Sequence, residues 1–301
     1  IAALLRTLGP QCVWAQDSAD LPLLARLLRP GAALRYFVND PLPAAPQVEA
    51  QLRALIARRG RITAGSDFAA ALLRRDFPAA ADAVDVIPSA IDPAMFNQGQ
   101  ITPERVLRLA ETWRVPENAS MILHLGVLRP GGGQEVFLHA LAALNRRDLF
   151  GVILGAEAAA GAHAQLAAQV ERHGLMGQVM LADDCRDLAA GLWLAQAVVA
   201  ANDRPCGALP ELLAAQAMGR PVIVSDAGAH AELVLPGETA WMIPAGDNAA
   251  LSAALTEVLG LSLQERLRIA MRMQQFIAGR ISYAAWLEAM QRETPAAAWA
   301  A

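Results

Sequence analysis

The chain has 301 residues, enough for two domains that each bury a core of their own. Its net charge of −4 at pH 7 gives no electrostatic case for a nucleic-acid partner, and no run approaches roughly eighteen consecutive strongly apolar residues, which argues against a membrane span. The three cysteines have no metal-site spacing and cannot all pair, so we predict a reducing, cytoplasmic setting. A peripheral membrane association stays open.

Short apolar runs alternate with helical patterns over residues 1–98. The runs predict strands at 12–17, 34–40, 61–66 and 84–92, and the patterns between them predict helices at 21–28, 47–58 and 67–75. Strands that alternate with helices indicate a parallel sheet with helices on its faces. Because the chain begins at Ile1 without a signal-peptide pattern, we expect it to be a piece of a longer protein.

Residues 93–101 lack periodicity, and Thr102-Pro103-Glu104 marks the start of a helix, so we expect a domain boundary near residue 98. The alternation then resumes with strands expected at 121–127, 150–155, 179–182, 198–201, 221–225 and 241–244, and with helices before, between and after them. This pattern predicts a second, doubly wound α/β domain over residues 99–280. A terminal helix in residues 281–301 is expected to pack back toward the first domain.

The stretch Ser120–Gln134 combines a buried strand, a glycine cluster and the start of an amphipathic helix. The first amides of a helix are unpaired and carry partial positive charge, so such a junction can bind an anion. Gly131, Gly132 and Gly133 would let a phosphate approach the backbone closely. A tight turn without any ligand is the alternative explanation.

Four motifs in order resemble the retaining nucleotide-sugar glycosyltransferases with two facing Rossmann-like domains, the GT-B fold of family four. They are VIPSAID at 86–92, ILHLGVLRPGGG at 122–133, AQAMGRPVI at 215–223 and DAGAHAELVLPGETAWMIPAGD at 226–247. The resemblance implies an α/β fold with two doubly wound parallel-sheet domains facing a cleft, of which the N-terminal one is incomplete here. It also implies a nucleotide-sugar donor bound by the second domain.

The departures from the family pattern concern the chemistry of the donor site. The family's two basic residues for the donor diphosphate fall at Val127 and Gly132, which leaves Arg129 as the nearest substitute or as an ordinary solvated side chain. The family's two glutamates, separated by seven residues, fall at Cys206 and Ala214. Glu211 lies one helical turn before Ala214 and could face the same side. The alternative is that Glu211 binds no ligand and is present because the helix dipole favours an acidic residue at the start of a helix.

The resemblance thus points to a set of candidate donor-binding residues. They are Arg129, Gly131, Gly132, Gly133, Asp183, Cys206, Gly207, Ala208, Leu209 and Glu211. No catalytic residue, metal ligand or cofactor other than the donor substrate is identified. His124 is expected to pack inside a strand, and His230 is the histidine best placed near the site.

We therefore interpret the chain as glycosyltransferase-like, transferring a hexosyl unit from a nucleoside-diphosphate sugar, with retention, to a glycan, lipid or protein acceptor that the sequence does not identify. The alternative is a catalytically inactive pseudo-glycosyltransferase, which keeps the fold as a binding or scaffold module within a larger protein or assembly. Loss of both cations and both glutamates favours the alternative. A protein or peripheral membrane partner remains open in either case.

Overall fold

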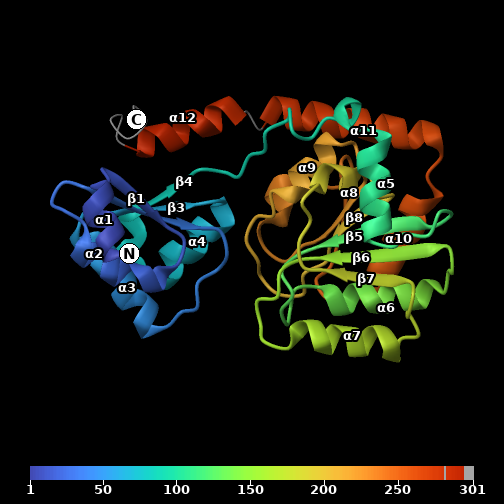
Figure 1. Ribbon diagram of the computed structural model, residues 1–301, viewed down its shortest axis with the longest axis horizontal. Coiled ribbons are helices and arrows are strands. Elements are labelled where there is room, and N and C mark those ends of the chain that lie inside the picture. The colour runs from blue at the N-terminus through green and yellow to red at the C-terminus, as the bar shows by residue number, and fades with distance from the viewer. Residues whose placement is uncertain (281–282, 295–301) are drawn as a thin grey trace. The chain divides into compact units, whose positions relative to one another are not determined.

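The computed structural model describes residues 1–280 and 283–294, which form two compact units (Figure 1). Unit 1 contains residues 1–90 together with helix α12, and unit 2 contains residues 91–280. Each unit is built on its own parallel sheet. The predicted fold class, α/β with two parallel sheets, is confirmed.

Unit 1 alternates strands and helices in sequence order. Its elements are α1 (Ala2–Leu8), β1 (Cys12–Ala15), η1 (Ser18–Asp20), α2 (Leu21–Leu27), β2 (Ala33–Val38), α3 (Pro46–Ala57), β3 (Arg61–Ala64), α4 (Asp67–Asp76), η2 (Pro78–Ala83), β4 (Val84–Val86) and α12 (Tyr283–Glu293). The strand order is β1-β2-β3-β4, all parallel. Each strand is followed in the sheet by its next neighbour in sequence, and each connection between parallel strands is right-handed. The connecting helices α2, α3 and α4 therefore all cover the same face of the sheet (Figure 1).

Strand β2 shows how the sequence assigns the two faces of this sheet. Its residues alternate between half-buried and buried, as the two-residue period of a strand requires. Leu34 and Tyr36 enter the core with residues of α2 and α3. Arg35, on the opposite face, donates a 2.8 Å hydrogen bond from Nε to the carbonyl oxygen of Glu293 and forms an ion pair with its carboxylate. Helix α12 therefore packs on the second face of the unit 1 sheet.

Unit 2 continues the alternation with a longer sheet. Its elements are η3 (Gln98–Gln100), α5 (Pro103–Thr112), β5 (Ser120–Leu125), α6 (Gln134–Leu144), β6 (Leu149–Leu154), α7 (Ala162–Arg172), β7 (Val179–Ala182), α8 (Leu188–Leu194), β8 (Ala197–Ala200), α9 (Glu211–Ala217), β9 (Val222–Ser225), η4 (Ala229–Leu233), β10 (Ala240–Ile243), α10 (Asn248–Gly260) and α11 (Leu263–Arg280). No helix in the described ranges is both long and apolar enough to cross a membrane.

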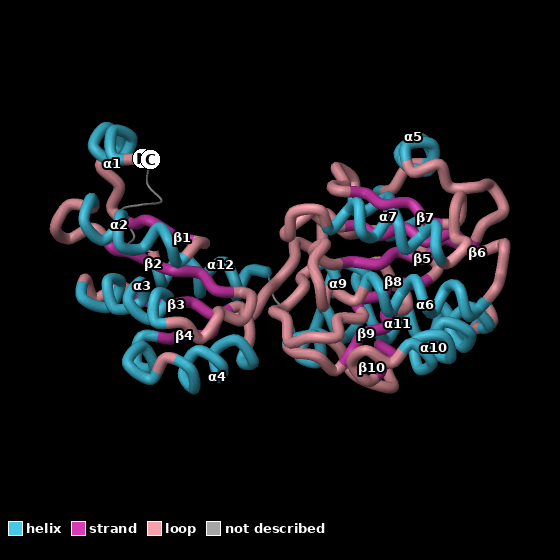
Figure 2. Tube along the Cα trace, turned by 90° about the horizontal axis from the view of Figure 1, so that it is seen from below, coloured by secondary structure: helices cyan, strands magenta, loops and turns pink. Residues whose placement is uncertain are grey.

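The six parallel strands of unit 2 have the order β10-β9-β8-β5-β6-β7 (Figure 2). This is the doubly wound arrangement, in which the chain starts at β5 and winds outward first to one edge and then to the other. Helices α6, α7 and α10 cover one face, and α5, α8, α9 and α11 cover the other (Figure 1). Strands buried on both faces read as continuous apolar runs, as VVA in β8 and VIV in β9 do. The direction of winding reverses between β5 and β8, and ligands of such folds bind at that point.

The start of α8 is fixed by an ion pair with α5. Both guanidinium nitrogens Nε and Nη2 of Arg105 donate to the Asp187 carboxylate, at 2.8 and 2.7 Å, and the same carboxylate caps α8 by accepting from the Ala190 amide at 3.1 Å. Hydrogen bonding by Arg105 holds the pKa of Asp187 below its ordinary value of 3.8. The stabilisation is therefore present above that pH and is lost as the pH falls through the lowered pKa.

Replacing Arg105 with alanine is expected to lower the free energy of unfolding by about 1 kcal/mol at neutral pH, because the pair is bidentate but partly exposed. Urea denaturation at pH 7 and at pH 3 checks this, and the cost of the substitution should shrink at the acid end. Arg108→Ala, an exposed arginine one turn further along α5, is the control. Equal costs for the two variants would contradict a structural role for the pair.

Candidate functional site

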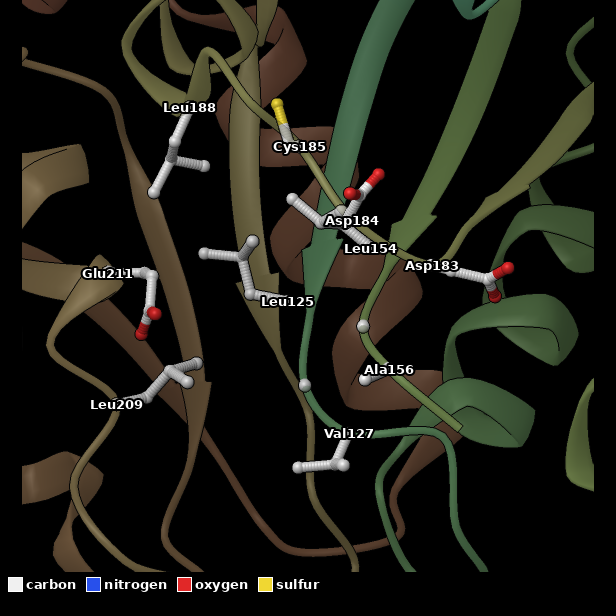
Figure 3. Close-up of a pocket in the computed structure, with 12 residues that line it drawn as sticks. Leu125, Val127, Leu154, Ala156, Asp183, Asp184, Cys185, Leu188, Leu209 and Glu211 are labelled. Carbon is white, nitrogen blue, oxygen red and sulfur yellow. The ribbon is translucent and has the colours of Figure 1, made fainter. Parts of the chain in front are cut away.

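A cavity of about 330 Å³ opens at the carboxyl ends of β5, β6 and β7, beside the point where the winding reverses (Figure 3). It is lined by Leu125, Gly126, Val127, Leu154, Gly155, Ala156, Asp183, Asp184, Cys185, Leu188, Leu209 and Glu211. The lining thus comes from the ends of three adjacent strands, the start of α8 and the loop that leads from β8 into α9. This volume lies at the lower end of the range of small-molecule sites.

The walls of the cavity are mostly apolar, and its only charged groups among the described residues are carboxylates. Figure 3 shows Glu211 and Leu209 on one wall and Asp184 beside Leu154 on the other, while the Asp183 side chain points away from Glu211. Oε2 of Glu211 is buried and has no hydrogen-bond partner within the described ranges. A buried acceptor without a partner is costly, so this oxygen is suited to a ligand that donates a hydrogen bond.

Cys185 also lines the cavity, but its thiol is not suited to nucleophilic chemistry. Burial raises the pKa of this thiol to about 11. The thiolate is the reactive form of cysteine, and it is scarce at neutral pH when the pKa is this high. In the described part of the chain, no group of three His, Cys, Asp or Glu side chains is arranged to hold a metal ion. The lining therefore provides binding surface and hydrogen-bond acceptors.

The glycine cluster before α6 is packed closely against the chain and lies outside the cavity. A Cβ at Gly133 would lie 2.3 Å from the carbonyl oxygen of Ala201, directly after β8. A Cβ at Gly132 would lie 2.5 Å from Oε1 of Gln134, whose amide nitrogen donates to the carbonyl oxygen of Val127 at 2.7 Å. Both positions are buried. Close packing thus accounts for these two glycines without a ligand, against backbone atoms at Gly133 and against the Gln134 side chain and the Val127 carbonyl at Gly132.

Gly131 is half-exposed, and its neighbour is a basic side chain that the sequence did not single out. A Cβ at Gly131 would lie 2.6 Å from Cδ of Arg204, in the loop after β8. The Arg204 side chain is exposed and has no hydrogen bond or ion pair with any residue in 1–280 or 283–294. The cation nearest to the glycine cluster that is open to a ligand is therefore Arg204. Arg129 instead borders a small separate hollow between the starts of α6 and α7, and it has interactions of its own.

The segment Cys206–Ala208 is buried behind the cavity wall. The Cys206 thiol donates to the carbonyl oxygen of Ala227 at 3.0 Å and lies 3.4 Å from Nε2 of His230, which is also buried. This segment joins the end of β8 to the residues that do reach the cavity, Leu209 and Glu211. The Cys206 sulfur faces the loop after β9, so the segment Cys206–Ala208 serves to position the cavity wall formed by Leu209 and Glu211.

His124 lies in the interior near this cluster. It is the fifth residue of β5, it is fully buried, and neither ring nitrogen has a hydrogen-bond partner among the described residues. Burial, reinforced by the nearby His230, outweighs the opposite effect of the backbone at Gly133 and lowers the pKa of His124 to about 3, so its imidazole is neutral at physiological pH. His124 therefore belongs to the core, as expected from its place in an apolar strand.

The structure thus separates the predicted site residues into three places. Asp183, Leu209 and Glu211 line the cavity, Cys206–Ala208 lie buried beside it, and Arg129 with the glycine cluster lies outside it. Sequence reasoning missed the apolar residues at the ends of β5 and β6, together with Cys185 and Arg204. The signal that was available for most of them is their position directly after a predicted strand.

Residues 119–260 match the protein family described as glycosyl transferases group 1. This matched range makes up most of unit 2, which therefore resembles a group 1 glycosyltransferase domain. Its matched range contains all the residues that line the cavity. The resemblance seen in the sequence motifs is thereby confirmed. No curated protein matches the chain.

Solved structures of glycosyltransferases are similar to almost the whole chain. A glycosyltransferase from Rickettsia africae ESF-5 is 16% identical with a TM-score of 0.80, over 97% of this chain and 78% of that one. Anabaena Alr3699/HepE in complex with UDP and glucose is 21% identical with a TM-score of 0.78, over 97% and 79%. WaaG, a glycosyltransferase involved in lipopolysaccharide biosynthesis, is 16% identical with a TM-score of 0.77, over 97% and 80%. These likenesses show that the fold is GT-B.

Proposed function

We propose that this protein binds a nucleoside-diphosphate sugar in unit 2 and transfers its hexosyl unit, with retention and without a metal, to a glycan, lipid or protein acceptor. One observation carries the proposal: a domain that resembles the group 1 glycosyltransferases has a small-molecule-sized cavity where its winding reverses. The similar Anabaena structure contains UDP and glucose, which supports the assignment of the donor class. No cofactor beyond the donor is part of the proposal.

The charges of the site indicate which part of the donor enters the cavity. Three carboxylates and no cation line it, so a phosphate inside would meet repulsion, whereas hydroxyl and N–H groups would find acceptors. The nucleoside therefore occupies the cavity. The diphosphate then lies outside, toward Gly131 and the open guanidinium of Arg204.

Sugar transfer leaves a nucleoside diphosphate, and its developing negative charge must be met by cations or backbone amides when no metal is used. A guanidinium can do this because it is always charged and donates two parallel hydrogen bonds to phosphate oxygens. In this chain Arg204 takes that role, because the positions of the family's basic pair hold Val127 and Gly132. Glu211 accepts hydrogen bonds from the nucleoside.

Specific observations favour a second candidate function, a pseudo-glycosyltransferase that uses the fold as a binding or scaffold module. Ala214 and Cys206, at the positions of the family's two glutamates, are 0% and 4% exposed. The space that a side chain at Gly132 would need is occupied by the Gln134 amide. Buried alanine and cysteine side chains cannot accept hydrogen bonds from a donor sugar as the family's glutamates would, and we expect this of a domain that does not turn over a substrate.

Ligand binding distinguishes the two functions. The protein is mixed with nucleoside diphosphates and their sugars, and thermal unfolding and calorimetry report binding. A ligand at a hundredfold excess over its Kd stabilises the native state by about 2.7 kcal/mol. Stabilisation by a nucleotide, followed by release of nucleoside diphosphate from its sugar when candidate acceptors are added, would support the transferase. No binding at millimolar concentration would overturn it in favour of the scaffold.

Replacing Arg204 with alanine is expected to weaken nucleoside-diphosphate binding by about tenfold, because one charge-assisted hydrogen-bonding group to phosphate is lost. Calorimetry with the diphosphate and with the corresponding nucleoside measures this, and nucleoside affinity should not change. Arg129→Ala is the matched control, since Arg129 borders a different hollow. A larger loss from Arg129→Ala than from Arg204→Ala would contradict the assignment of the phosphate position.

A further inference from the structure

All charged groups that line the cavity accept hydrogen bonds and donate none, since carboxylates have no proton to give. Glu211 restricts the choice of ligand most, because its Oε2 is buried without a hydrogen-bond partner in the described part of the chain. Asp184 approaches the cavity from the opposite wall, on the loop that follows β7 (Figure 3). The apolar side chain of Leu125 lies between them, and Leu188 lies above Glu211 in the view of Figure 3; both suit the flat face of an aromatic ring.

The edges of the four common nucleobases differ in what they offer such acceptors. Guanine presents two adjacent N–H donors, at N1 and N2, which one carboxylate can accept in parallel. Adenine and cytosine each pair one amino donor with a neighbouring acceptor nitrogen. Uracil places its single N–H between two carbonyl oxygens, which repel a carboxylate. A carboxylate at the base therefore favours guanine and opposes uracil.

We propose that Glu211 selects guanine, so that the nucleotide this cavity takes is a guanosine diphosphate or its sugar. This inference rests on the proposed binding of a nucleoside diphosphate in unit 2 and goes further by naming its base. Glu211 accepts the N1 and N2 protons of guanine, which satisfies the buried Oε2. Asp184, exposed at the mouth, holds the other side of the nucleoside.

The competing role for Glu211 is to accept hydrogen bonds from ribose hydroxyls. That role would be independent of the base, because all four nucleotides carry the same ribose. It would also leave the uridine and guanosine nucleotides with similar affinities. The ratio of the two affinities therefore separates base recognition from ribose recognition.

The test is calorimetry of the full chain with GDP, ADP, CDP and UDP, for the wild type and for Glu211→Gln. In the wild type GDP should bind at least about tenfold more tightly than UDP. The glutamine amide replaces one acceptor with a donor, so Glu211→Gln should weaken GDP, strengthen UDP and reduce their ratio at least about tenfold. Glu257→Gln, an exposed carboxylate on α10 outside this cavity, should leave the ratio unchanged. Thermal unfolding without ligand verifies that the variants are folded.

Binding of UDP, ADP or CDP as tightly as GDP would overturn the guanine assignment while leaving the proposed nucleotide-binding function intact. A GDP-to-UDP ratio that does not respond to Glu211→Gln would likewise remove Glu211 from base selection. Failure of all four nucleotides to bind the folded wild type would overturn the proposed function itself, and with it the inference.

Discussion

Gly133→Ala is expected to destabilise unit 2 by at least about 3 kcal/mol. The backbone at Gly133 has φ +84°, a region that costs an alanine about 1–2 kcal/mol. The added Cβ would also lie 2.3 Å from the carbonyl oxygen of Ala201 and 2.7 Å from the amide nitrogen of Asn202. Because both are backbone atoms of the loop that follows β8, relief requires this loop to shift, and such overpacking costs about a further 1–3 kcal/mol.

Gly177→Ala provides a matched control that measures only the cost of placing alanine at a positive φ. Gly177 has φ +77°, and a Cβ there would have no atom within 4 Å, so its cost should be about 1 kcal/mol. Denaturant unfolding, with hydrogen exchange at the amides of β5 and β8 to report on unit 2, measures both variants. Equal costs would contradict close packing as the reason for the glycine and would return the cluster to a phosphate-binding explanation.

The strands and helices could largely be predicted from the sequence, because buried parallel strands are short apolar runs between polar or glycine-rich breaks. The run VMLA was predicted at 179–182 and forms β7 over the same residues. The predicted and the observed end of a strand differ where the backbone geometry, rather than the hydropathy, ends the strand. Strand β5 was expected to reach Val127 but ends at Leu125, because Gly126 adopts φ +147°.

Helix α1 was not predicted. It has only seven residues, two turns of helix, and none of them is buried. In so short a segment the 3.6-residue period has no room to repeat, so the pattern of apolar residues does not identify a helix.

The candidate site could be predicted only in part, because strand order is not written in the sequence. Glu211 and Asp183 carried a chemical signal and line the cavity, whereas Leu154 lines it only because β6 pairs with β5. The same limit explains the two arginines. Arg129 is nearer to Gly131 along the chain, yet Arg204 contacts it, because β8 is the other neighbour of β5.

The unpartnered imidazole of His124 should dominate the acid sensitivity of unit 2. Burial, followed by the effect of His230, lowers the pKa of this ring from 6.5 to about 3. Between these values the unfolded chain binds a proton that the folded chain does not, so the free energy of unfolding falls as the pH falls. The slope from this single group is about 1.4 kcal/mol per pH unit, which amounts to about 3 kcal/mol at pH 4.5.

His124→Leu removes this proton-linked loss with little change in side-chain volume. At neutral pH the variant should be at least as stable as the wild type, because two buried ring nitrogens without partners are replaced by apolar atoms. The difference in the free energy of unfolding between His124→Leu and the wild type should then grow as the pH is lowered from 7 to 4.5, which urea denaturation at several pH values measures. Ile153→Leu, at the position paired with His124 on β6, removes no titratable group, so its curve should run parallel to that of the wild type. A parallel curve for His124→Leu as well would show that the imidazole takes up a proton as readily in the folded state as in the unfolded chain, and would contradict the lowering of its pKa by burial.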